Sequence, residues 1–382
     1  MSQASADPAW AQPNQKTPKS LVAGERCLHR QNNRNHQFDL LRILFATLVL
    51  LSHASQLAYG ASREPLSRFS GTPMTFGALG VDGFFVLSGY LIVQSWLGDP
   101  ELINFLRKRV LRIFPGYLVA FALSTLIVGL LAPGIDHFFR HLDGTFYRSM
   151  VLLTGPKTPP VFPGQPFPMV NGAMYTIAYE FRCYLLVALL GLCGLFRRPM
   201  VCLAITCLLM STLLYLAVFE HMRPFKASLL GIPLLTVRLT GIYLVGVCFH
   251  LFRKEIKFRP WFALAATAGA ALFIVLFPAK AEFAMVLSGS YLMFYLGQMN
   301  LPWLSGMSRF PDISYGIYLY GFPVESLWIW FHRGSPWVTF FASTVICFGL
   351  GWLSWHMVER PALALKRRGS AKLSPGAPVP VA

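Results

Sequence analysis

The sequence has few charged residues, and acidic residues are the scarcest of them. Only 13% of the 382 residues are charged, whereas 55% are hydrophobic. Apolar runs of about 20 residues, long enough to cross a bilayer core, recur along the chain. This composition excludes an ordinary soluble domain and predicts an integral membrane protein.

Motifs for disulfides, metal and secretion are also lacking. The seven cysteines form no Cys-x-x-Cys pair, lie mostly in apolar runs, and have no histidines at zinc-binding spacing, so we expect neither disulfides nor a metal site. Residues 1–37 are polar and contain no signal-peptide core. We interpret them as a disordered cytoplasmic tail, residues 38–362 as the membrane domain, and residues 363–382 as a basic, proline-rich cytoplasmic tail.

The apolar runs predict an all-α polytopic membrane protein with about ten transmembrane helices. The predicted spans are 39–58, 77–97, 113–132, 173–195, 200–219, 233–252, 261–277, 281–298, 312–331 and 338–357.

The distribution of basic residues orients these spans. Of the 33 Lys and Arg residues, 21 fall on the segments that are cytoplasmic if the N-terminus is inside, and nine on the outer ones. The positive-inside rule therefore places both termini in the cytoplasm and explains the net charge of +17 without nucleic acid. The long outer connection, 133–172, is rich in proline and glycine, so we expect an irregular segment that either roofs a site or is a stiff surface loop.

Ionisable residues inside the spans are the main functional signal, because burying them in a bilayer is costly. Arg42 and His53 are eleven residues apart, about three helical turns and about 16 Å, so they share one helix face. By the same rise, His53, Asp82 and Glu180 have similar depths toward the outside. They could form one cluster in which a carboxylate orients an imidazole base.

Each of these residues also has a structural interpretation. His53 could be satisfied by a neighbouring backbone or hydroxyl group, and Asp82 or Glu180 could be a hydrogen-bonding residue between helices. Ser88, in "LSGY", lacks the strand-to-helix elbow of a hydrolase nucleophile, so we expect it to allow close helix packing.

A cationic cluster is predicted at the cytoplasmic face. The stretch "RKRVLRIFP" contains Arg107, Lys108, Arg109 and Arg112, and Arg109 and Arg112 share one side of a helix. With Arg42 they either anchor the topology and contact anionic lipid, or bind phosphate through bidentate arginine contacts.

These motifs resemble those of the membrane-bound acyltransferase 3 family, the bacterial enzymes that O-acylate surface and extracellular polysaccharides. The resemblance covers about 36–362. It rests on six motifs in matching order: Arg-x10-His (Arg42, His53), "GVDGFFVLSGYLI", Arg-x-x-Arg (Arg109, Arg112), "NGAMYTIAYEFRCYLL", "ISYGIYLYGFPV" and "VERP".

The resemblance implies an inner-membrane acyltransferase that moves an acyl group, expected to be acetyl, from cytoplasmic acyl-CoA to a hydroxyl of a polysaccharide or lipid-linked glycan. Carried over by position, His53 is the catalytic base, Arg42 its companion, and Arg109 and Arg112 contact the CoA phosphates. Asp82 and Glu180 match acidic positions of the family. The acceptor sugar, the size of the acyl group, the oxyanion donors, and any homo-oligomer or envelope-synthesis complex stay open.

The sequence departs from the family pattern in three places. Met174 and Tyr175 stand where many members have Leu-Trp, and Gly321 stands where many have His. No soluble esterase-like domain is expected after Pro361, so transfer would fall to the membrane domain or to a partner.

Two other classes of protein remain compatible with the sequence. A transporter or polysaccharide exporter could use His53, Asp82 and Glu180 as a proton or substrate site, although it has no specific use for the Arg-x-x-Arg pair. A non-enzymatic scaffold would not need His53 at all.

Overall fold

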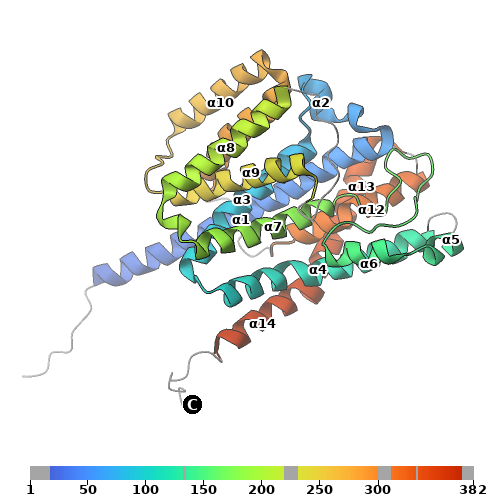
Figure 1. Ribbon diagram of the computed structural model, residues 1–382, viewed down its shortest axis with the longest axis horizontal. Coiled ribbons are helices and arrows are strands. Elements are labelled where there is room, and N and C mark those ends of the chain that lie inside the picture. The colour runs from blue at the N-terminus through green and yellow to red at the C-terminus, as the bar shows by residue number, and fades with distance from the viewer. Residues whose placement is uncertain (1–17, 132–134, 219–230, 300–310, 333, 372–382) are drawn as a thin grey trace, which may run out of the picture.

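The computed structural model describes residues 18–131, 135–218, 231–299, 311–332 and 334–371. Within these ranges the regular structure is helical, and no strand is present (Figure 1). The helices are α1 (Pro18–Tyr59), η1 (Ala61–Arg63), α2 (Pro65–Ser70), α3 (Phe76–Gly98), α4 (Leu102–Leu131), α5 (Ile135–Arg140), α6 (Gly144–Val151), α7 (Tyr175–Leu192), η2 (Leu195–Arg197), α8 (Pro199–Val218), α9 (Pro233–Leu251), α10 (Pro260–Leu276), η3 (Pro278–Lys280), α11 (Ala281–Leu296), α12 (Ser314–His332), α13 (Pro336–Ser354), the π-helical turn η5 (Trp355–Glu359) and α14 (Arg360–Ala371).

Each of the ten predicted spans coincides with a helix. Six helical segments are long and apolar enough to cross a membrane: Gln37–Tyr59, Phe76–Gly98, Leu102–Leu131, Tyr175–Leu192, Pro233–Leu251 and Pro336–Leu365. Two more apolar helical stretches, Pro199–Tyr215 and Pro260–Leu276, are shorter. The chain is thus an all-helical membrane protein, while the number of crossings and the sidedness of the termini stay predictions.

Helices extend into both predicted tails. α1 begins at Pro18, so the chain from that residue to Gln37 is helical rather than disordered, because it continues an apolar helix without an intervening proline. At the other end, α14 extends the helical chain to Ala371. Residues 1–17 and 372–382 lie outside the described ranges.

Local sequence signals set several helix starts. Proline occupies the first turn of α9, α10 and α13, where its missing N–H costs no hydrogen bond. The buried Glu64 carboxylate accepts from the backbone N–H groups of Ser67, at 2.8 Å, and Phe76, at 2.7 Å. One side chain therefore ties the start of α2 to that of α3.

α3 and α9 pack with their backbones almost in contact. A Cβ atom on Gly89 would lie 2.0 Å from the Tyr243 carbonyl oxygen, and one on Gly246 would lie 1.9 Å from the Val86 carbonyl oxygen. Both positions therefore need glycine, as small-residue packing in membranes requires. The adjacent Ser88 instead donates its hydroxyl to Glu180, so the close approach predicted for Ser88 is made by its neighbour Gly89.

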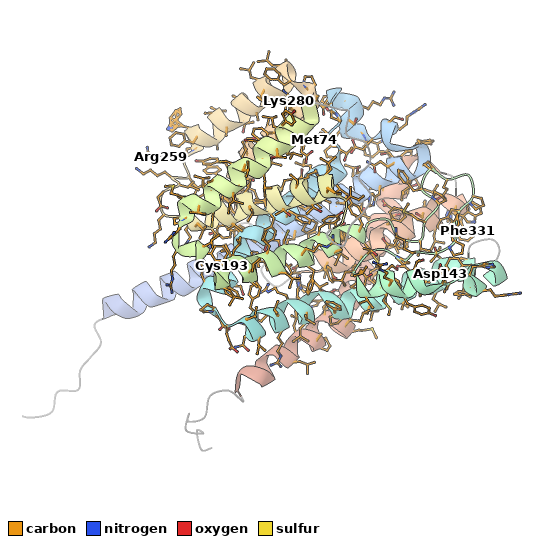
Figure 2. All side chains as sticks on the ribbon, in the orientation of Figure 1. Met74, Asp143, Cys193, Arg259, Lys280 and Phe331 are labelled. Atoms are coloured by element: carbon orange, nitrogen blue, oxygen red, sulfur yellow. The ribbon has the colours of Figure 1, made fainter. Side chains whose placement is uncertain are left out.

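The helices form one bundle with α1 near its centre. α1 packs against α3, α12 and α13, while α9 joins α3 to α8. In Figure 1, α8 and α10 lie on one side of α1, and α4 and α14 lie on the other. Of the residues labelled in Figure 2, Cys193 and Arg259 lie toward one end of the bundle, and Asp143 and Phe331 lie toward the other.

The connection predicted to be irregular is partly helical. Its first half forms α5 and α6, and Asp143 caps α6 by accepting from the Thr145 backbone N–H at 2.8 Å. The proline-rich second half has no helix, as expected. It is held against α12 because the Asn171 amide donates to the Leu319 carbonyl oxygen at 2.9 Å and the Gln165 amide donates to that of Ser326 at 3.2 Å.

Candidate functional site

One cavity is lined by all three of the predicted phosphate-binding arginines. Arg42 from α1 and Arg109 and Arg112 from α4 line a space of about 260 Å³, which we call the arginine cavity. Glu180 and Tyr184 from α7, and Tyr315 and Tyr318 from α12, complete much of its wall. The sequence prediction that these arginines meet is confirmed.

Two of the arginines share one carboxylate. Asp312 Oδ2 lies 3.0 Å from Arg42 Nη1 and 2.5 Å from Arg112 Nη2. Asp312 Oδ1 accepts from the Ser314 hydroxyl at 2.5 Å, which fixes the carboxylate at the start of α12. A second carboxylate, Glu359 in η5, lies 3.6 Å from Arg112 Nη1. These carboxylates hold the guanidinium groups in place inside the bundle.

Arg109 differs from its two neighbours. It donates to the Ser95 hydroxyl at 2.8 Å, and its guanidinium carbon lies 5.4 Å from the centre of the Phe105 ring and 5.8 Å from that of the Tyr184 ring. Within the described ranges no carboxylate forms an ion pair with it, and its buried Nε has no hydrogen-bond partner. An unpaired buried donor beside two more arginines suits an anionic ligand such as phosphate.

A second cavity, of about 520 Å³, contains His53, and we call it the histidine cavity. α1 contributes His53 and Gln56, α7 contributes Tyr175 and Thr176, and α12 contributes Tyr318 and Phe322. The irregular segment after α6 supplies Phe167, Met169, Gly172 and Ala173 to the wall. This segment therefore forms part of the wall of the histidine cavity.

The predicted cluster of His53, Asp82 and Glu180 does not form. Asp82 Oδ1 lies 2.6 Å from Arg238 Nη2 on α9, and Arg238 also pairs with Glu282 on α11. Glu180 lines the arginine cavity, where it accepts from the Tyr184 hydroxyl at 2.5 Å and from the Ser88 hydroxyl at 3.2 Å. Helix rise predicts similar depths for His53, Asp82 and Glu180. The helices that carry them are rotated so that the three side chains face different neighbours.

The carboxylate beside His53 is Glu325. Its Oε2 lies 3.6 Å from His53 Nδ1, and its side chain is 0% exposed. Neither Glu325 oxygen has a hydrogen-bond partner among the described residues, and within them the imidazole of His53 is its ion-pair partner. Phe322, one turn earlier on α12, packs its ring edge-on to the imidazole at 5.5 Å.

Sequence reasoning missed Glu325, although the signal was present. Glu325 is an acidic residue within the predicted span 312–331. Ionisable residues inside a span are costly to bury, and this argument, which selected Asp82 and Glu180, applies equally to Glu325. It lies 272 positions from His53 in the chain. No local pattern links two residues so far apart.

The structure shows the surroundings of the residues at which this sequence departs from the family pattern. A Cβ atom on Gly321 would lie 2.7 Å from Leu50 Cδ2 on α1, so a larger side chain here would require the Leu50 side chain to shift. Met174 is fully buried, whereas Tyr175 lines the histidine cavity. Tyr175 is therefore the member of this pair that can contact a substrate.

The fold and these cavities define a polytopic helical membrane protein with a histidine–carboxylate pair beside an arginine-lined cavity. Residues 35–356 match the acyltransferase domain family (Acyl_transf_3), and the chain belongs to that family of membrane-embedded acyltransferases.

Two relatives align with nearly the whole chain. Nodulation protein 10 of Rhizobium leguminosarum bv. viciae is 30% identical over 362 residues, which cover 88% of this chain and 95% of that protein. An O-acetyl transferase of Shigella phage Sf6 is 26% identical over 355 residues, 90% of this chain and 99% of the phage protein. No solved structure matches the chain.

Proposed function

We propose that the protein is an O-acyltransferase of the bacterial inner membrane, which moves an acetyl group from cytoplasmic acetyl-CoA to a hydroxyl of a cell-surface or exported glycan. The observation that carries the proposal is the adjacency of the arginine cavity and the histidine cavity within one membrane domain. The family assignment and the name of the phage relative support O-acetyl transfer, and they favour an enzyme over a transporter.

The arginine cavity is the proposed donor site. Arg109, with an unpaired buried Nε, is its best placed phosphate contact, and Arg42 and Arg112 add positive charge beside it. Asp312 keeps these two arginines folded inward before the donor arrives. The remaining carboxylate, Glu180, is held by Ser88 and Tyr184 and has a wall-forming role in this proposal.

The histidine cavity is the proposed acceptor site, and His53 is the proposed general base. His53 takes the proton of the acceptor hydroxyl as that oxygen bonds to the thioester carbonyl carbon. When the carbon–sulfur bond breaks, the imidazolium returns this proton to the leaving thiolate. Glu325 orients the imidazole and stabilises its charged form. Asp82 has an indirect role here, because it holds Arg238 at the wall of the acceptor site.

The test compares membranes that contain the wild-type protein, His53→Ala or His332→Ala at matched levels. Radiolabelled acetyl-CoA is added, and label in extracted glycan is counted and identified by proton NMR. His332 is an exposed histidine on α12 and serves as the control. We expect labelling by wild type and His332→Ala, and a loss of about 100-fold or more with His53→Ala.

Two results would contradict the proposal. If no protein transfers label from acetyl-CoA to any glycan, the enzyme assignment to this reaction is wrong and the transporter hypothesis regains support. If His53→Ala transfers label at the wild-type rate, His53 is not the base.

A further inference from the structure

The wall between the two cavities is made by few residues. Within the described part of the chain, three residues line both spaces: Val81 from α3, Thr176 from α7 and Tyr318 from α12. They come from three different helices that meet at this level of the bundle. These side chains therefore separate the arginines from His53, and we call them the partition.

Hydrogen bonds hold Tyr318 across the partition. Its hydroxyl donates to the Ala173 carbonyl oxygen at 2.8 Å and lies 2.5 Å from the Thr176 hydroxyl. At the other end, its ring packs edge-on against Phe84, with the ring centres 6.0 Å apart. Because both ends are fixed, the ring is a defined obstacle rather than a freely rotating side chain.

Any acyl group that travels from the arginine cavity to His53 must pass the partition. This step rests on the proposed function, in which the CoA phosphates are bound at the arginines and the thioester reaches the histidine. The reacting acyl chain would then lie against Val81, Thr176 and Tyr318 while the acceptor attacks. A pocket wall that contacts a chain in this way discriminates by about 10- to 200-fold for each added methylene.

We propose that the partition selects the acyl group, with Tyr318 as the main specificity-determining residue, and that it restricts transfer to acetyl-sized groups. The ring of Tyr318 excludes longer chains, and the hydrogen bonds to Thr176 and Ala173 keep the ring in place. Val81 forms the opposing apolar surface of the same passage.

The experiment measures initial rates of transfer from acetyl-, propionyl- and butyryl-CoA to membrane glycan. Wild type is compared with Tyr318→Ala, which removes the ring, and with Tyr318→Phe, which keeps the ring and removes the hydroxyl. Val81→Ala widens the opposing surface and tests the same passage if Tyr318→Ala does not fold. The readout is the butyryl-to-acetyl rate ratio, which a general loss of folded protein does not change.

We expect wild type to prefer acetyl-CoA strongly and Tyr318→Ala or Val81→Ala to raise the ratio by about tenfold or more. Tyr318→Phe keeps the ring but loses the hydrogen bonds that hold it, so it should raise the ratio by less than Tyr318→Ala does. The inference is overturned if wild type transfers acetyl but the widened variants keep its ratio, or if wild type uses butyryl-CoA as readily as acetyl-CoA. Absence of transfer from every acyl-CoA by every protein instead overturns the proposed function, and the inference with it.

Discussion

Replacing Glu325 by Gln tests the histidine–carboxylate pair most directly. The substitution removes the ionisable carboxyl group and keeps the size of a side chain that is 0% exposed. Glu325 Oε2 lies 3.6 Å from His53 Nδ1. A charged imidazolium and a carboxylate at this distance attract by about 4.6 kcal/mol when the effective dielectric constant is about 20.

Only part of that attraction is available to catalysis. The pair is buried, and removal of both groups from water offsets much of the Coulomb energy. We therefore expect a net loss of about 1.4 to 2.8 kcal/mol in transition-state stabilisation, which is roughly a ten- to hundredfold fall in kcat. The KM for acetyl-CoA should stay unchanged, because Glu325 is not among the residues that line the arginine cavity.

The assay measures the initial rate of label transfer to glycan over a range of acetyl-CoA concentrations, at matched amounts of folded protein. Glu325→Asp keeps a carboxyl group and should recover part of the rate. Ser326→Ala is the control, since Ser326 is also 0% exposed on α12 and its hydroxyl makes no hydrogen bond within the described ranges. A kcat for Glu325→Gln within twofold of wild type would refute the reasoning, as would an equal loss in Ser326→Ala.

Two further predictions concern the donor site and the helix packing. Arg109→Ala should raise the KM for acetyl-CoA by about 10- to 100-fold with little change in kcat, because it removes a charged hydrogen-bond donor from the phosphates. The control is Arg107→Ala, since the Arg107 guanidinium donates to the Leu365 carbonyl oxygen. Equal kinetics for the two variants would argue against a phosphate contact. Gly246→Ala should destabilise the bundle by about 1–3 kcal/mol, because its Cβ would lie 1.9 Å from the Val86 carbonyl oxygen. Gly269→Ala on α10, where a Cβ would meet nothing within 4 Å, should be neutral or slightly stabilising in the same thermal unfolding measurement, and equal effects of the two would contradict the packing argument.

Much of the donor site could be predicted from the sequence. Arg109 and Arg112 are three residues apart on one helix, so helical geometry alone places them together. Arg42 joins them because positive residues at span ends gather at one face of the membrane. The partner that balances Arg42 and Arg112, Asp312, was not predicted, since its two contacts join three segments distant in the chain.

The acceptor side shows the limit of depth arguments. The rise of 1.5 Å per residue predicts the height of a side chain along its helix. It does not predict how the helix is rotated about its own axis, and therefore not which neighbouring helix the side chain faces. Asp82 faces Arg238 on α9, and Glu180 faces the arginine cavity. Similar height was therefore insufficient to bring either carboxylate to His53.

The sequence by itself determined the class of protein, the apolar helical segments and the residues that belong to acyltransferase motifs, because hydropathy and helical spacing are local properties. The tertiary structure decided which helices are neighbours and how each is rotated. That choice pairs His53 with Glu325 and sets Tyr318 between the two cavities, because α1 packs against α12 and brings these faces of the two helices together.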